Sequence, residues 1–305
     1  VLFLTTPFLF YVHNNPLPPS LNFHLFLLPL HNYFIIDTMY YILLLVSLAL
    51  IIVGAMLLTD GSVAVARRFR MPEFIVGLTI MAVGTSMPEL TVSFMSAING
   101  HGDMAIGNVV GSNIFNVLAI LGVCALFSPV LFTRTNVRRD IPMCIIATLM
   151  LTAVTLIGGN ISHLEGAILL ISYVAMIWYM IRTEKGEAEQ VEVESTPAMP
   201  TWRIPVWIVL GLGGLIFGGD IFVDSASNIA RDWGVSEATI AITLVAGGTS
   251  MPELASSLVS IFKGRASLAL GNVLGSNIAN ILLILGVCGS VTPLTMGGVA
   301  MSDVY

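Results

Sequence analysis

The sequence predicts an all-α, polytopic membrane protein of two inverted five-helix repeats, with about eight spans present of an expected ten. Three observations predict this class. Of the 305 residues, 56% are hydrophobic and 10% are charged, whereas the surface of a soluble domain requires about 25% charged residues. Apolar stretches long enough to cross a bilayer recur along the chain, and one block of sequence appears twice. A soluble globular protein is therefore excluded.

Residues 1–38 precede the first clean apolar stretch and differ from it. Prolines and histidines are scattered through them, the first acid is Asp37, and the basic segment that opens a signal peptide is missing. Met39 begins the apolar stretch. We therefore expect residues 1–38 to be an N-terminal extension of doubtful function.

Short polar connections divide the rest of the chain into apolar stretches of a length that can span a bilayer. Lipid offers no partner to backbone N–H and C=O groups, so these stretches must be helices, and their unalternating pattern does not fit a transmembrane barrel. The eight predicted spans are 40–59, 72–98, 104–127, 141–158, 163–182, 203–223, 237–262 and 266–291.

Nearly all Lys and Arg residues lie in the connections that follow odd-numbered spans. The connections after spans two, four and six hold only Arg231. Since basic residues are retained on the cytoplasmic side, we expect the segment before Tyr40 to lie outside and the acidic linker 183–202 to be cytoplasmic. The connections after spans one, three, five and seven hold Arg67, Arg68, Arg70, Arg134, Arg138, Arg139, Arg182, Lys185, Arg203, Lys263 and Arg265.

Charge and cysteine content exclude other classes of protein. The 12 basic and 18 acidic residues give a net charge of −6, and without a basic face nucleic-acid binding is excluded. Five of the acids lie in the linker 183–202, so the net charge describes that loop. Cys124, Cys144 and Cys288 lie in apolar stretches without metal or redox spacing, which predicts small buried side chains.

An internal repeat appears at an offset of 164 residues. Residues 84–90 recur letter for letter at 248–254, and GNVVGSNIFNVLAILGVC at 107–124 recurs as GNVLGSNIANILLILGVC at 271–288. From Val76/Ile240 onward, 28 of 54 ungapped pairs are identical. Because each unit contains five spans, an odd number, the second unit must be inverted, as in many secondary transporters.

The repeat defines two halves and an expected continuation. We interpret 39–182 as the first inverted repeat and 203–305 as the second, joined by the linker 183–202. Counterparts of spans four and five would fall at 305–322 and 327–346, so a ten-helix protein is expected and the second repeat is incomplete at its C-terminal end.

Glu89 and Glu253 are the ionisable residues deepest in apolar context, at equivalent positions of the two repeats. A lone ionised group at membrane depth costs at least a few kcal/mol. A bound cation would compensate both carboxylates. Protonated or hydrogen-bonded acids that hold helices together are the alternative.

A proline precedes each of these acids. Pro88 and Pro252 lack an N–H and clash with the carbonyl four residues back, so each helix should open at that turn. Opened backbone at membrane depth is tolerated where it lines a cavity, and its freed carbonyls can serve as ligands. Small Ala82 and Ala246, one turn earlier, leave room for carbonyl access, although close helix packing would also explain them.

Hydroxyl and amide oxygens accompany the two acids. These side chains are all oxygen donors, which Ca²⁺ and Na⁺ prefer, and neither Cys nor His joins them. In each repeat a Thr and a Ser precede the Glu by one turn, and a Ser and an Asn follow on the next span: Thr85, Ser86, Ser112 and Asn116, and Thr249, Ser250, Ser276 and Asn280. Either an accessory ligand role or a helix-bridging role is open for Asn108, Asn113, Asn272 and Asn277.

The doubled GTSMPE and GSNIxN blocks resemble the two α-repeats of the Ca²⁺/cation antiporter superfamily, and specifically of compact prokaryotic members of its Na⁺/Ca²⁺ exchanger family. The resemblance implies that Thr85, Glu89, Thr249 and Glu253 bind Ca²⁺. It also implies Na⁺ sites that add Ala82, Ser86, Ser112, Asn116, Ala246, Ser250, Ser276 and Asn280. Some relatives have Asp where this chain has Asn116 or Asn280, which leaves the counter-ion open between Na⁺ and H⁺.

The expected function is therefore secondary antiport of Ca²⁺ against Na⁺ by alternating access, without enzymatic activity or a cofactor. Spans one and six would slide against the bundle, with Gly54, Gly61, Gly218 and the run 211–214 allowing close packing. The expected location is a prokaryotic inner membrane, with lipid and small cations as the only predicted partners and no predicted oligomeric state.

Three alternatives remain at this stage. The first is a Ca²⁺/H⁺ antiporter on the same fold. The second is an intramembrane hydrolase, which would need two unlike carboxylate environments, whereas the repeats supply similar ones. The third is a chain that does not transport because its last two helices are absent.

Overall fold

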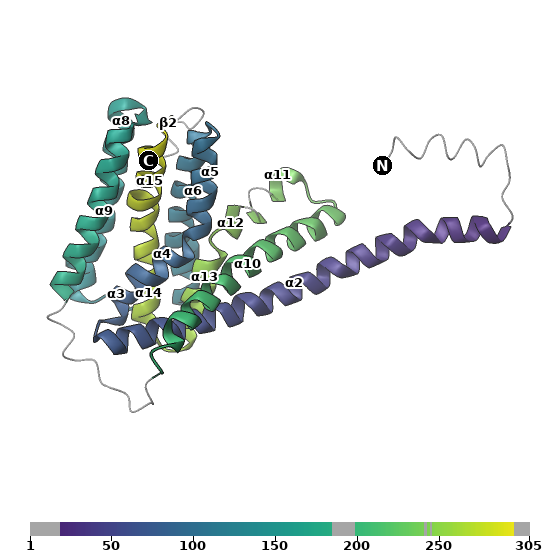
Figure 1. Cartoon of the computed structure of the whole chain (residues 1–305), viewed down its shortest axis with the longest axis horizontal. Coiled ribbons are helices and arrows are strands. Elements are labelled where there is room, and N and C mark those ends of the chain that lie inside the picture. Colours follow the sequence, from purple (N-terminus) through teal and green to yellow (C-terminus); the bar gives the residue numbers. More distant parts are fainter. Residues whose placement is uncertain (1–18, 185–198, 241–242, 245, 296–305) are drawn as a thin grey trace.

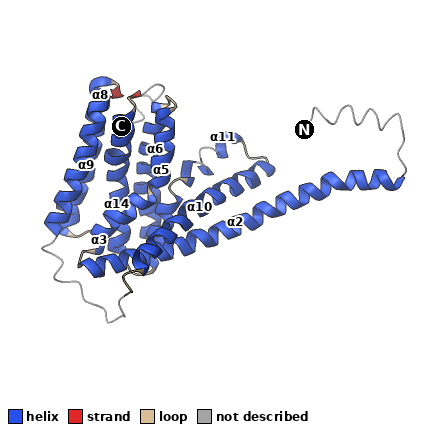
Figure 2. Cartoon of the chain, in the orientation of Figure 1, coloured by secondary structure: helices blue, strands red, loops and turns tan. Residues whose placement is uncertain are grey.

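The computed structural model describes residues 19–184, 199–240, 243–244 and 246–295, which are almost entirely helical (Figure 2). The helices are α2 (Pro19–Phe69), α3 (Glu73–Val76), α4 (Ala82–Thr85), α5 (Met87–Ile98), α6 (Gly102–Phe115), α7 (Leu121–Phe127), α8 (Ile141–Gly158), α9 (His163–Glu184), α10 (Arg203–Asp232), α11 (Glu237–Ile240), α12 (Ala246–Gly248), α13 (Met251–Phe262), α14 (Ala266–Ile278) and α15 (Leu285–Val291). Wider π-helical turns are η1 (Gly77–Met81), η2 (Asn116–Ile120), η3 (Asn136–Asp140) and η6 (Ala279–Ile284). Strands β1 (Asn160–Ile161) and β2 (Leu294–Thr295) pair antiparallel.

Membrane-spanning helices account for most of the described chain. Six helices are long and apolar enough to cross a bilayer, and the bent pair formed by 73–85 and 87–98 makes a seventh candidate. These candidates confirm the predicted polytopic all-α class. Within the predicted span 237–262 the described helices are α11, α12 and α13, residues 241–242 and 245 lie outside the described residues, and Met251–Phe262 is a shorter continuous apolar helix.

Two predicted spans end too early. Helix α2 continues to Phe69 and α10 to Asp232, beyond the expected ends at 59 and 223. Asp60, which directly follows the predicted end of span one, forms an ion pair with Lys263 at 2.5 Å. A charged side chain with such a partner need not end the helix.

Helices α2 and α10 lie side by side and cross the remaining bundle at an angle (Figure 1). Their backbones approach closely at glycines. A Cβ atom on Gly54 would lie 2.8 Å from the Gly211 carbonyl oxygen, and one on Gly211 would lie 2.6 Å from Leu58 N. The predicted close packing of spans one and six through small residues is confirmed.

Helix α14 occupies the centre of the bundle. Its apolar span is 94% buried, whereas the equivalent span in the first repeat, which contains α6, is 28% buried. The α14 backbone crosses α3 and η1 so closely that a Cβ atom on Gly271 would overlap the Phe74 carbonyl. Within the described residues the two copies of this repeated sequence are thus buried to different extents.

The predicted division into domains stays a prediction. Of the predicted extension 1–38, residues 1–18 lie outside the described residues, and so do residues 185–198 of the predicted linker. The backbone of 19–38 belongs to α2.

Candidate functional site

Both predicted helix openings are present in the structure. Helix α4 ends at Thr85 and α5 begins at Met87 after a bend of 47°, and Pro88 lies in the first turn of α5. The second repeat has the same break between α12 and α13, with Pro252 in the first turn of α13. Proline has no N–H to donate to the preceding helical turn, which explains each break. Glu89 and Glu253 therefore lie in the first turns of the helices that follow the breaks.

The two glutamates lie between the repeats, each held by the other half of the chain. Ser250 Oγ donates to Glu89 Oε1 at 3.0 Å, and Ser86 Oγ donates to Glu253 Oε1 at 2.8 Å. Glu89 is 1% exposed and Glu253 is fully buried, and their carboxylates are close enough to interact electrostatically. The helix N-termini that carry them favour negative charge, but the two charges oppose one another.

Several buried oxygens around these carboxylates have no hydrogen-bond partner. Buried polar atoms are normally satisfied, so such a group indicates an unmet need for a ligand. Among the described residues, the unpartnered oxygens of predicted ligands are Glu89 Oε2, Asn116 Oδ1, Thr249 Oγ1, Glu253 Oε2, Ser276 Oγ and Asn280 Oδ1. Oxygen-only coordination of this kind suits Ca²⁺ or Na⁺. The described residues hold no cluster of three or more His, Cys, Asp or Glu side chains that could hold a metal.

The remaining predicted hydroxyls lie at the same place. Ser112 approaches the Glu89 carboxylate, and Thr85 approaches that of Glu253. The Ala82 carbonyl, predicted as a free ligand, accepts the Ser86 N–H at 3.1 Å. The backbone of Ala246 begins α12 at the equivalent position.

Four asparagines connect the two repeats behind the carboxylates. Asn116 Nδ2 donates to Asn277 Oδ1 at 3.1 Å, and Asn280 Nδ2 donates to Asn113 Oδ1 at 3.0 Å. These bonds orient the two amides through Nδ2 and leave Oδ1 of Asn116 and of Asn280 without a partner, so both oxygens are acceptors available to a cation. For Asn113 and Asn277 the geometry corresponds to a bridging role.

Asn108 and Asn272 hold the helices that carry the glutamates. Asn108 Nδ2 donates to Ser93 Oγ at 2.9 Å and to the Glu89 carbonyl at 3.3 Å. Asn272 Nδ2 donates to Ser257 Oγ at 3.0 Å. Ser93 and Ser257 were not predicted as functional residues, although they are identical at the repeat offset of 164 residues, and that identity was the available signal.

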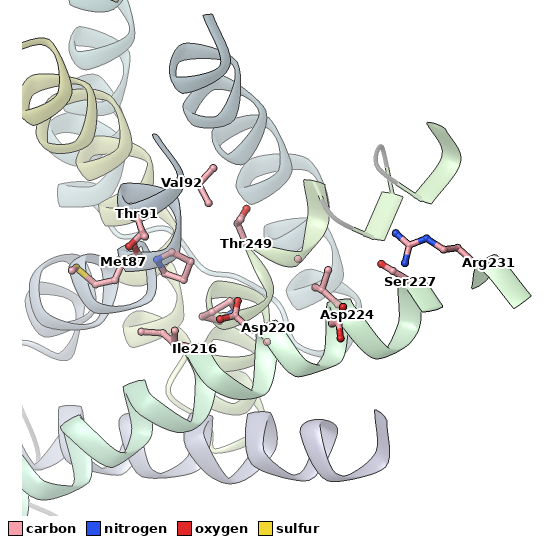
Figure 3. A pocket seen from close by; sticks show the side chains of 14 residues that line it. Met87, Thr91, Val92, Ile216, Asp220, Asp224, Ser227, Arg231 and Thr249 are labelled. Carbon is pink, nitrogen blue, oxygen red and sulfur yellow. The ribbon is translucent and has the colours of Figure 1, made fainter. Parts of the chain in front are cut away.

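A groove of about 450 Å³ leads to this site between α5, α10 and the α12–α13 break. Figure 3 shows Asp220, Asp224, Ser227 and Arg231 in succession along α10, with Thr249 and the α5 residues across the groove. Asp220 and Asp224 are exposed. Both acids were missed as functional candidates because they fall near the predicted end of span six.

Comparisons with known proteins agree with this architecture. A family model described as sodium/calcium exchanger protein matches residues 39–182 and 203–303. The "Putative antiporter CaxA" of Alkalimonas amylolytica is 39% identical over 83% of this chain and 81% of its own length. The sodium/calcium exchanger MaX1 of Methanosarcina acetivorans is 30% identical over 87% of this chain and 86% of its own. A structure of the sodium-calcium exchanger NCX_Mj, soaked with Na⁺ and Ca²⁺, superposes with a TM-score of 0.74 at 31% identity, covering 88% of this chain and 87% of that one.

Proposed function

Because the chain belongs to the sodium/calcium exchanger family, we propose that it is a secondary antiporter that exchanges Ca²⁺ for Na⁺ at a site built around Glu89 and Glu253. One observation carries this proposal. Two buried carboxylates from opposite repeats lie close enough to interact electrostatically, and each retains an unpartnered oxygen. A divalent cation, or several monovalent ones, would neutralise the pair.

The proposed ligands follow the sequence and their placement around the carboxylates. Ca²⁺ binds through Thr85, Glu89, Thr249 and Glu253. Na⁺ uses Ala82, Ser86, Ser112, Asn116, Ala246, Ser250, Ser276 and Asn280. The unpartnered oxygens of Asn116, Ser276 and Asn280 support the second set.

Charge neutralisation explains how opposite fluxes are coupled. The empty site carries −2, and closing this charge off from water is costly. Loaded with Ca²⁺ or Na⁺, the site loses most of that penalty and can be enclosed. The loaded forms therefore switch sides and the empty form resists, so that one ion crosses only when another returns.

The proposed location is a prokaryotic inner membrane, with the segment before Tyr40 outside and the linker 183–202 inside. The distribution of Lys and Arg supports this orientation. Under this orientation the α5–α10 groove, which contains Arg231, opens to the outside.

Na⁺ is proposed as the counter-ion, and H⁺ is the second candidate because Asn116 and Asn280 are both amides, whereas some relatives have Asp at one of these positions. In vesicles containing the full chain, we expect an outward Na⁺ gradient to drive accumulation of labelled Ca²⁺. A protonophore should leave this uptake unchanged. Uptake driven by an imposed proton gradient without Na⁺ would instead favour Ca²⁺/H⁺ exchange.

The acids of the groove predict a salt-dependent effect on Ca²⁺ capture. Because Asp220 and Asp224 attract cations toward Thr249, the Asp220→Asn, Asp224→Asn double variant should require about two- to threefold more Ca²⁺ for half-maximal uptake at low ionic strength. The maximal rate should stay the same. In high concentrations of choline chloride, which screens exposed charges, the difference should vanish. A difference that persists in high salt would place these acids in the binding site itself.

A further inference from the structure

The two faces of the site differ in how tightly they are closed. The helix pairs α5–α10 and α13–α2 occupy equivalent positions at the offset of 164 residues, yet only the second pair is packed together. Val92 of α5 is 42% exposed and lines the groove, whereas its equivalent, Ser256 of α13, is fully buried. Ala255 and Val259 of α13 pack against the apolar cluster that includes Ile51 and Leu58 of α2. The structure is therefore open along α10 and closed along α2.

Ion pairs connect the closed face. At the turn between α13 and α14, Lys263 Nζ contacts Asp60 Oδ1 at 2.5 Å and donates to the Met56 carbonyl at 3.3 Å. Arg265 Nη1 contacts Glu73 Oε1 at 3.0 Å. Both cations thus join the α13–α14 turn to α2 and to the start of α3.

The open face has acids at the positions equivalent to those of the two ion pairs, but it has neither Lys nor Arg at the positions equivalent to Lys263 and Arg265. The repeat equivalents of Asp60 and Glu73 are Asp224 and Glu237, whereas Lys263 and Arg265 correspond to Asn99 and His101. The turns themselves are alike, since Gly100 and Gly264 have φ values of 82° and 71°.

Asp224 is exposed and lines the groove. Glu237 pairs with Arg231 of α10 at 2.7 Å instead of with the α5–α6 turn. The asymmetry of the two turns therefore coincides with the asymmetry of closure.

We propose that Lys263 and Arg265 are positioning residues that hold α2 against α13 and bias the exchange cycle toward the conformation open along α10. This inference rests on the proposed transport function. Opening the α2 face requires separating Lys263 from Asp60 and Arg265 from Glu73. These side chains are 18–41% exposed, so each pair should shift the conformational equilibrium by up to about fivefold.

Two equivalent probe positions can measure the bias. Thr91 lines the open groove and Ala255, its repeat equivalent, lies on the closed face. Each is replaced by cysteine in the full chain after Cys124, Cys144 and Cys288 are changed to alanine. Membrane-impermeant maleimide is then applied to either side of reconstituted vesicles. The Thr91→Cys protein should react rapidly and the Ala255→Cys protein slowly.

Removing the pairs should expose the closed face. With Lys263→Gln, Arg265→Gln, we expect the labelling rate at position 255 to rise by up to about fivefold for each pair lost. The matched variant Asn99→Gln, His101→Gln changes the equivalent turn of the open face and should leave that rate unaltered. The exchanged pair Asp60→Lys, Lys263→Asp should restore slow labelling, because an ion pair of the opposite polarity can form.

An unchanged labelling rate at position 255 after loss of both cations would overturn the proposal. The proposal would also be overturned if position 255 were labelled as fast in the Asp60→Lys, Lys263→Asp protein as in the Asp60→Lys single variant. The faster labelling would then come from a general loss of packing and not from the loss of the ion pair. Labelling reports access and needs no ion flux. A failure of the proposed exchange would appear in Ca²⁺ uptake instead, so the two failures can be told apart.

Discussion

The Glu89→Gln, Glu253→Gln double variant is expected to lose Ca²⁺ exchange completely. Glutamine preserves the shape of each side chain but removes both charges of the site and turns an amide donor toward the cation. Removing one partner of a buried charge interaction costs about 3–5 kcal/mol, so each single variant should weaken Ca²⁺ binding by at least about 100-fold. Uptake of labelled Ca²⁺ by vesicles and calorimetric binding in detergent measure the two effects.

The control for this experiment is Asp232→Asn, which removes an exposed carboxylate at the end of α10. It should exchange Ca²⁺ like the unmodified chain. The double variant should still elute as a folded monodisperse protein, because neutral side chains relieve the repulsion between the buried carboxylates. Unchanged Ca²⁺ flux in the folded double variant would reject the site and restore other uses of two buried acids, including intramembrane hydrolysis.

The broken helices and the meeting of the two glutamates could be predicted because their causes are local. Pro88 and Pro252 each remove a backbone hydrogen bond within an apolar stretch and so open the helix there, and the offset between the copies fixes which residues are equivalent. An odd number of spans in each unit then requires inversion. These arguments use neither packing nor long-range contacts, and they predict the helix breaks beside Glu89 and Glu253 that the structure contains.

The ends of α2 and α10, and the acids of the groove, depend on tertiary contacts and were not predictable. Whether Asp60 ends a span depends on Lys263, which lies about 200 residues away in the sequence. Asp224 is equivalent to Asp60 in the repeat and has a different environment, as a groove residue. Hydropathy depends only on the residue type at each position, so it does not distinguish Asp60 from Asp224.

Gly107 and Gly271 occupy the same position of the repeat, yet alanine should be tolerated at the first and not at the second. A Cβ atom on Gly271 would overlap the Phe74 carbonyl and lie 3.0 Å from Leu78 N, whereas no atom of the described residues lies within 4 Å of one on Gly107. Backbone atoms cannot move aside as the end of a flexible side chain can. Gly271→Ala should therefore lower the free energy of unfolding by about 1–3 kcal/mol. We expect its melting temperature in detergent to fall by several degrees, and that of Gly107→Ala to stay the same or rise slightly.

Gly271→Ala should also affect the site, because α14 contains Ser276 and continues into η6, which contains Asn280. Pushing α14 away from α3 displaces these oxygens relative to Glu253, so the Gly271→Ala protein that does fold should bind Ca²⁺ more weakly than Gly107→Ala. Equal melting temperatures for the two variants would contradict the central packing of α14. Lower stability with unchanged Ca²⁺ affinity would mean that the ligands of the second repeat are positioned by the α13 break alone.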